Sequence, residues 1–245
     1  MLKIIKEIVG RIWALWAIVI FLAPMLVFIW FYLICFLLPE PAASKWHRAV
    51  SRVWMNIFLP LAGCPLKVTG KQHFKKGSNY VVVCNHNSLL DVPATTPFMP
   101  NANKTIAKKS FTKIPLFGWI YRAGSVLVDR NSDKSRRESY DQMKKTLAIG
   151  LDMVIYPEGT RNRTGDPLKS FYDGAFRLAV DTGKPIMPVV LFNTKKVLPA
   201  NKIFYMMPHR LHMDILEPVT TQGLTHAQLK EKVFKIMWNY YDANK

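Results

Sequence analysis

The sequence is poor in cysteine, and it lacks several motifs that would assign a function. Its 245 residues include only three cysteines, and their spacing matches no metal site, so they are expected to be reduced core residues of a domain that faces the cytosol. It contains no internal repeat, no low-complexity tract, no Gly-x-Ser-x-Gly nucleophile elbow and no nucleic-acid-binding motif. These absences argue against repeat proteins, elbow-type serine hydrolases and nucleic-acid-binding modules.

Acidic residues are also scarce relative to basic ones. There are 16 Asp and Glu against 34 Lys and Arg, and the net charge is +18. Such an excess attracts polyanions, namely nucleic acid, anionic lipid surfaces or phosphorylated substrates. Without a nucleic-acid-binding motif, no nucleic-acid partner is expected, whereas anionic membrane lipids are. One open alternative is therefore a non-enzymatic membrane protein that binds anionic lipids.

Charge is absent altogether from residues 12–38. A straight helix of that length would be about 40 Å long, more than the roughly 30 Å hydrocarbon core of a bilayer. Pro24 lies near its middle, where it would kink or break the helix. Basic residues flank both ends about equally, as expected if both ends face the same side. Residues 1–40 are therefore predicted to form a membrane anchor, either one tilted or kinked span or, as we prefer, a hairpin of two half-length helices.

Residues 41–64 connect this anchor to the rest of the chain. Trp46, Val50, Trp54 and Phe58 recur at helical spacing, with basic residues between them. This pattern predicts an amphipathic helix. It would either lie on an anionic membrane surface or pack on the core of the domain, and the sequence favours neither.

From residue 65 to 245, apolar strand patterns alternate with helical ones. This alternation predicts one α/β domain, a mixed sheet flanked by helices. Strands are predicted at 66–69, 80–84, 104–107, 125–128, 153–156, 186–192 and 211–215, and helices at 88–96, 115–121, 133–149, 174–181 and 226–241.

One stretch joins a predicted buried strand to a helix through polar turn residues. Three consecutive valines, 81–83, are followed by His86 in the turn and by Asp91 in the first helical turn. There the two side chains can meet, giving an imidazole held by a carboxylate, which suits a general base. Alternatively, Ser88 and Asp91 form a capping box beside a passive histidine.

Other strand ends also carry polar functional residues. Lys108, Arg130 and the segment 158–161 (Glu-Gly-Thr-Arg) each follow a predicted strand. Ligands of open α/β sheets gather at the carboxyl ends of strands, and arginines bind phosphate in two parallel hydrogen bonds. Each charge alone is explained as well by a solvated surface, or for Arg130 by a pair with Asp129 or Asp133. Their joint position at strand ends favours a phosphate-binding site.

Four segments, in order, resemble the conserved blocks of the glycerophospholipid acyltransferases. Residues 85–91 (Asn-His-Asn-Ser-Leu-Leu-Asp) resemble the NHxSxxD form of the HX4D motif, and 124–130 resemble the second block, which ends in Arg. Residues 156–161 resemble the third block, FPEGTR, with Tyr156 replacing Phe, and 185–189 resemble the fourth, with its paired prolines. The resemblance covers residues 65–192, and within the family it points to the bacterial 1-acylglycerol-3-phosphate acyltransferases.

This resemblance implies transfer of an acyl chain from acyl-CoA or acyl carrier protein to the sn-2 hydroxyl of lysophosphatidic acid. The product would be phosphatidic acid, in phospholipid biosynthesis. By position, His86 would be the general base and Asp91 would orient its ring. The expected substrate-binding residues are Lys108, Arg130, Glu158, Gly159, Thr160 and Arg161.

The resemblance implies no cofactor and no metal, since the donor is itself a substrate. It also places the protein at the cell inner membrane or plasma membrane, with the catalytic domain facing the cytoplasm.

Two further alternatives keep the enzyme class open. In the first, the acceptor is a lyso-ornithine lipid, another lysophospholipid or glycerol 3-phosphate. A hydrolase would need Ser88 or Cys84 as its nucleophile.

Overall fold

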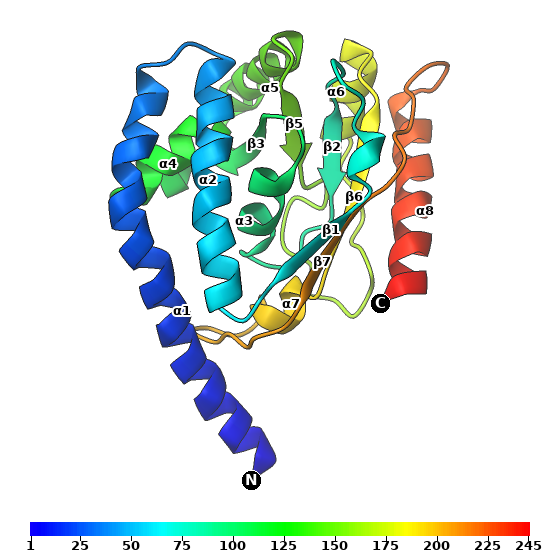
Figure 1. Cartoon of the computed structure of the whole chain (residues 1–245). Coiled ribbons are helices and arrows are strands. Elements are labelled where there is room, and N and C mark those ends of the chain that lie inside the picture. The colour runs from blue at the N-terminus through cyan, green and yellow to red at the C-terminus, as the bar shows by residue number, and fades with distance from the viewer.

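The centre of the fold is a seven-stranded sheet with the order β1-β7-β6-β2-β5-β3-β4 (Figure 1). The computed structural model describes all 245 residues. All neighbouring strands are parallel except β6 and β7, so the sheet is mixed, as predicted. The strands are β1 (Leu66–Thr69), β2 (Val81–Cys84), β3 (Asn103–Lys108), β4 (Ser125–Val128), β5 (Asp152–Ile155), β6 (Ile186–Phe192) and β7 (Leu211–Ile215).

Helices cover both faces of this sheet. The α-helices are α1 (Leu2–Leu33), α2 (Ala42–Leu61), α3 (Asp91–Thr95), α4 (Phe117–Ala123), α5 (Asp133–Ala148), α6 (Gly174–Thr182), α7 (Thr194–Val197) and α8 (His226–Asn244). Short 3-10 turns lie at Ile34–Phe36, Lys71–His73, Thr96–Phe98 and Lys109–Lys113. Every predicted strand and helix of the α/β domain is present, with ends within three residues of the prediction; only the short α7 was not predicted.

The side-chain alternation of β2 divides the core into two parts. Val82 and Cys84 join the cluster that includes α1 and α2, whereas Val81 and Val83 join the cluster under α5, α6 and α8. All four side chains are fully buried. Because successive residues of a strand point to opposite faces, an apolar run of this kind requires cover on both sides. The central strand is thereby fixed, and so is the position of the loop that follows it.

The N-terminal segment is a single helix, so the prediction of two half-length helices within residues 1–40 is wrong. Helix α1 continues through Pro24, and the chain turns only after residue 36. Buried contacts of Ile20 and Met25 on either side of Pro24 hold the helix where the proline removes one backbone hydrogen bond. Pro39 and Pro41 lie at the turn instead, and α2 runs back beside α1 (Figure 1).

Helix α1 is long and apolar enough to cross a membrane. Only 28% of its most apolar 18-residue window is buried by the rest of the chain. The indole of Trp13 donates to the carbonyl of Ala62, 3.0 Å away, and that of Trp16 to the carbonyl of Leu61, so one side of α1 is docked on the end of α2. The remaining apolar sides are exposed, and the N-terminal end projects beyond the body of the protein (Figure 1).

Helix α2 packs on the domain along one face. Trp54 and Phe58 are buried in the core cluster, as the core-packing alternative for this segment required. Val53, Ile57 and Leu61 form an exposed apolar stripe on another face of the same helix. The helix therefore supports the domain and also leaves apolar surface beside the exposed sides of α1.

One buried acid lies at the amino ends of the strands, opposite the turn that carries His86. Asp152, at the start of β5, is fully buried, and its Oδ1 accepts from the backbone N–H of Tyr80, 2.8 Å away. Its Oδ2 has no hydrogen-bond partner. Burial raises the pKa of Asp152 to about 7, because removal from water penalises the charged carboxylate.

Candidate active site

The loop that carries His86 leaves the carboxyl end of β2, in the middle of the sheet. The Asn85 side chain ties this loop to β6, donating to the carbonyl of Leu191 at 2.9 Å and accepting from its N–H at 2.7 Å. Ser88 donates to the carbonyl of Leu198 at 2.8 Å. The loop is thus held from the β6 side before the histidine and again after it.

His86 and Asp91 meet as predicted. Nδ1 of His86 lies 2.8 Å from Oδ2 of Asp91, and the same oxygen accepts the backbone N–H groups of Asn87 at 2.6 Å and Ser88 at 2.7 Å. One carboxylate oxygen therefore both orients the imidazole and accepts from the free donors of the turn, but the alternative capping box does not form, because Leu90 is the N-cap of α3 and the Ser88 hydroxyl accepts from the N–H of Leu90. Because Oδ2 can only accept, Nδ1 carries a proton and Nε2 is left with its lone pair, as a base requires.

The two side chains of this pair differ in their exposure to solvent. The side chain of Asp91 is 1% exposed and that of His86 is 20% exposed. Oδ1 of Asp91 has no hydrogen-bond partner. A buried carboxylate in contact with the ring stabilises the imidazolium that forms when His86 takes a proton.

The backbone of His86 is clamped by the loop that follows β5. Oε1 of Glu158 accepts from the N–H of His86 at 2.7 Å, and the N–H of Asn162 donates to the carbonyl of His86 at 2.6 Å. The other oxygen of Glu158 accepts from the N–H of Lys169 at 3.0 Å. The segments 85–91 and 156–161 are therefore one structural unit, although 64 residues separate them in sequence.

Glu158 lies beneath the site and does not line it. Its side chain is fully buried, and both oxygens accept backbone N–H groups, so in this conformation it faces the histidine loop rather than a substrate. Burial raises the pKa of Glu158 to about 7, partly offset by the two N–H donors, which favour the charged form. The structure supports a positioning role for this residue.

Tyr156, which stands where the family has Phe, packs against the histidine. The ring centroids of Tyr156 and His86 are 4.7 Å apart. The Tyr156 hydroxyl is 2.6 Å from Oγ1 of Thr95, which in turn donates to the backbone carbonyl of Asp91. The additional hydroxyl thus has a buried partner, which is why the substitution is accommodated within the core.

The predicted cationic residues follow the carboxyl ends of β3, β4 and β5, strands that all lie on the same side of β2 in the sheet. Nη1 of Arg130 donates to the carbonyl of Gly159, which joins the β4 and β5 loops. Gly159 has a φ of +69°, and a Cβ there would lie 2.7 Å from the ring of Tyr172, so only glycine fits without strain. Thr160 accepts from Nζ of Lys169 at 2.8 Å.

The positive charges at this edge are not neutralised by acids. Lys108 and Arg130 are exposed and Arg161 is half-buried, and none of the three forms an ion pair. Asp133 pairs with Arg136, which removes one of the acids that the sequence offered to Arg130. Three unpaired cations at one edge form a site suited to phosphate.

The two candidate nucleophiles for hydrolysis are poorly placed. Cys84 is fully buried, and burial raises the pKa of its thiol well above the ordinary value, which suppresses the reactive thiolate. Ser88 is also buried, and its hydroxyl donates to Leu198 and accepts from the N–H of Leu90. Neither side chain is accessible, whereas that of His86 is 20% exposed.

A family model described as Acyltransferase matches residues 65–192, more than half of the chain. The chain belongs to the acyltransferase family. The matched region begins at β1 and ends with β6, so it contains the His86–Asp91 pair, the Glu158 clamp and the cationic edge.

Individual acyltransferases agree with this membership. The chain is 29% identical to the 1-acyl-sn-glycerol-3-phosphate acyltransferase of Saccharomyces cerevisiae, over 87% of this chain and 70% of the yeast protein. It is 33% identical to that of Borreliella burgdorferi, over 62% of this chain and 61% of that protein. The crystal structure of the 1-acyl-sn-glycerophosphate acyltransferase PlsC from Thermotoga maritima superposes with a TM-score of 0.82, at 24% identity and 96% coverage of both chains, so the two share the fold.

Sequence reasoning missed the residues outside the predicted site that support the His86–Asp91 pair. Asn162 and Lys169 act through backbone N–H groups, which any residue type supplies, so the sequence carries no signal for them. Thr95 acts through its side-chain hydroxyl, and Tyr172 restricts the space at Gly159. The replacement of Phe by Tyr156 was the one clue to a nearby polar partner, and Thr95 is that partner.

Proposed function

We propose that this acyltransferase moves an acyl chain from a thioester donor to the sn-2 hydroxyl of lysophosphatidic acid, giving phosphatidic acid. The observation that carries the proposal is a buried carboxylate holding a partly exposed imidazole, with three unpaired cations after the neighbouring strands β3, β4 and β5. The names of the yeast and Borreliella relatives support the same acceptor.

In this reaction His86 acts as the general base. Its Nε2 takes the proton of the acceptor hydroxyl while the hydroxyl oxygen attacks the thioester carbonyl carbon. The tetrahedral intermediate then collapses, the C–S bond breaks, and the imidazolium returns the proton to the departing thiolate. Asp91, 2.8 Å from Nδ1, stabilises the imidazolium in between. A positioned base of this kind contributes about 10²–10⁴-fold to the rate.

The phosphate of the acceptor binds at the cationic edge. Arg130 and Arg161 would form charge-assisted hydrogen bonds to it, and Lys108 would add a third charge. Gly159 has no side chain at the point where Arg130, in the loop after β4, donates a hydrogen bond to its carbonyl in the loop after β5. Thr160 is exposed on the same loop. Glu158 is buried and positions His86 by accepting a hydrogen bond from its backbone N–H.

Helix α1 would anchor the enzyme in the membrane that holds the acceptor. Its exposed apolar sides, together with the stripe on α2, supply a surface for the bilayer, and the net charge of +18 attracts anionic headgroups. We place the catalytic domain on the cytoplasmic face of the inner or plasma membrane, where acyl-CoA and acyl carrier protein are found.

Acyl transfer by the purified, detergent-solubilised chain tests the proposal. Radiolabelled acyl-CoA is supplied with lysophosphatidic acid, glycerol 3-phosphate, a lysophospholipid with an additional headgroup, and a lyso-ornithine lipid. The expected result is acylation of lysophosphatidic acid at sn-2, shown by mass spectrometry of the product. Preferred acylation of the lyso-ornithine lipid would overturn the acceptor, and release of free fatty acid alone would overturn the reaction class.

A further inference from the structure

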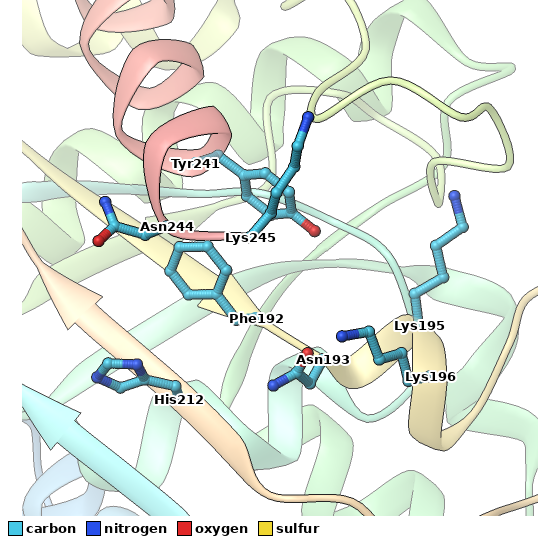
Figure 2. Close-up of a pocket in the computed structure, with 8 residues that line it drawn as sticks. All are labelled: Phe192, Asn193, Lys195, Lys196, His212, Tyr241, Asn244 and Lys245. Carbon is cyan, nitrogen blue, oxygen red and sulfur yellow. The ribbon is translucent and has the colours of Figure 1, made fainter.

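A basic pocket lies on the opposite side of the catalytic loop from the cationic edge. It is a cavity of about 310 Å³ where β6 and β7 meet α7 and the end of α8 (Figure 2). Lys195 and Lys196 line it from α7, and Lys245 lines it just after α8. His212 of β7 adds a fourth basic side chain, whose Nε2 lies 2.8 Å from Oδ1 of Asp214. No Asp or Glu lines the cavity, and although Lys245 pairs with Asp242 outside it, Lys195 and Lys196 have no acidic partner, so its chemistry suits an anion.

The same pocket contains aromatic and amide groups. Phe192 and Tyr241 stack with their ring centroids 4.9 Å apart, and the ring of His212 lies 6.0 Å from that of Phe192. The amide side chains of Asn193 and Asn244 complete the lining. Aromatic faces and amides beside lysines are the groups that hold a phosphorylated nucleotide, with a base against the rings and phosphates at the ammonium groups.

The pocket borders the catalytic loop directly. Phe192 follows Leu191, the residue whose backbone is tied to Asn85. The Tyr241 hydroxyl lies next to the side chain of Asn87, which follows His86 in the chain. A group bound in this pocket would therefore be about one side chain away from the loop of the general base.

The strand order sets the two basic regions on either side of His86. Strands β5, β3 and β4 carry the cationic edge on one side of β2, whereas β6 and β7 carry the pocket on the other. Acyl transfer between two anionic substrates needs two binding sites for charged groups, with the base between them. The cationic edge, where Arg130 meets Gly159, supplies the first. The pocket supplies the second.

We propose that this pocket binds the phosphorylated nucleotide of an acyl-CoA donor. The inference rests on the proposed function and adds to it the identity of the donor. The pantetheine arm of CoA is a flexible chain that separates the nucleotide from the thioester, so the nucleotide can sit beside Tyr241 while the thioester reaches His86. A concave cavity favours this small-molecule group over the flat or convex contact that an acidic carrier protein makes.

Kinetics with two donors test the assignment in the full-length, solubilised protein. Acyl-CoA is compared with the matching acyl-pantetheine, which has the same thioester and no nucleotide. The double variant Lys196→Ala with Lys245→Ala is compared with Lys75→Ala with Lys76→Ala, two exposed lysines at the opposite end of β2. Lys195 is left in place because it also donates to the carbonyl of Thr164.

The pocket variant is expected to raise KM for acyl-CoA roughly tenfold, as loss of two solvent-accessible charge pairs predicts. Its kcat at saturation, its KM for lysophosphatidic acid and its KM for acyl-pantetheine should stay near wild type. The Lys75/Lys76 control should change none of these values. An unchanged KM for acyl-CoA in the pocket variant, or an equal rise for both donors, overturns the assignment.

Two further measurements distinguish the proposed ligand of the pocket from other ligands. If the pocket variant raises KM only for acyl carrier protein donors, the pocket is a protein-docking site. If it only weakens binding to phosphatidylglycerol vesicles, the pocket is a lipid-headgroup site. Either result overturns the proposal. Calorimetric titration with CoA alone keeps the inference separate from the proposed function. If lysophosphatidic acid is not acylated but CoA binds and the pocket variant weakens binding, only the acceptor was wrong. If CoA does not bind, the pocket assignment fails.

Discussion

Replacing Asp91 by Asn separates the two roles of its carboxylate. Oδ2 accepts three N–H groups, from the His86 ring and from the backbone of Asn87 and Ser88, whereas Oδ1 has no partner. The carbonyl of an Asn can therefore take the place of Oδ2 and keep all three bonds, and its amide can take the place of Oδ1. Only the negative charge is removed.

The magnitude follows from the negative charge that the hydrogen-bond acceptor of the imidazolium loses. A hydrogen bond to a charged group is worth about 1.5–3 kcal/mol against about 0.5–1.5 kcal/mol for a neutral one, so weakening it by about 1–1.5 kcal/mol in Asp91→Asn should lower kcat about 5- to 13-fold. Asp91→Ala should do more, because it leaves the turn N–H groups without an acceptor, at about 1–3 kcal/mol each in the free energy of unfolding. Steady-state kinetics and denaturant unfolding of both variants measure these two effects.

Two results would refute this reasoning. If Asp91→Asn retains wild-type kcat, the charge on Asp91 takes no part in stabilising the imidazolium. If Asp91→Asn is as unstable as Asp91→Ala, the three hydrogen bonds do not converge on one oxygen as the structure shows. Near-wild-type stability together with the expected loss of kcat supports both roles.

Three other substitutions test positions outside the dyad. Asp152 should make the free energy of unfolding of wild type fall by up to about 4 kcal/mol between pH 4 and 7, because the folded protein holds the proton of Asp152 up to about pH 7 and the unfolded chain releases it near 3.8. Asp152→Asn should remove that part of the fall. Urea unfolding of both proteins across this pH range measures the difference. Gly159→Ala places a Cβ against Tyr172 at positive φ and should lower the melting temperature and raise KM for the acceptor in steady-state assays. Tyr156→Phe should leave kcat near wild type and cost about 0.5–1.5 kcal/mol by urea unfolding, since it removes only the hydroxyl that meets Thr95.

Most of the α/β domain was predictable because its strands are short apolar runs bounded by turn residues. The three valines of β2 are an example: only a strand covered on both faces accommodates them, and both core clusters include β2 residues. The meeting of His86 and Asp91 was also predictable, since a turn residue and a residue of the next helical turn are neighbours in space.

The single-helix form of the N-terminal segment and the hydrogen-bond partners of Glu158 were beyond the reach of the sequence. Pro24 predicts a break when read alone, but the buried residues around it hold α1 together, and packing of that kind is set by the tertiary structure. Glu158 stands in a motif associated with the substrate, and only the structure shows that its oxygens face the backbone of His86 and Lys169. The basic pocket joins residues of β6, α7, β7 and α8, none of which shares a sequence motif.

Acyl transfer to lysophosphatidic acid by wild type and His86→Ala tests the account most directly. Both proteins are purified in detergent, shown to have the same circular dichroism spectrum and melting temperature, and assayed with the same labelled acyl-CoA. A lost general base should lower kcat by at least about two orders of magnitude. A folded His86→Ala protein that acylates lysophosphatidic acid at the wild-type rate would contradict the assignment of His86 as the base.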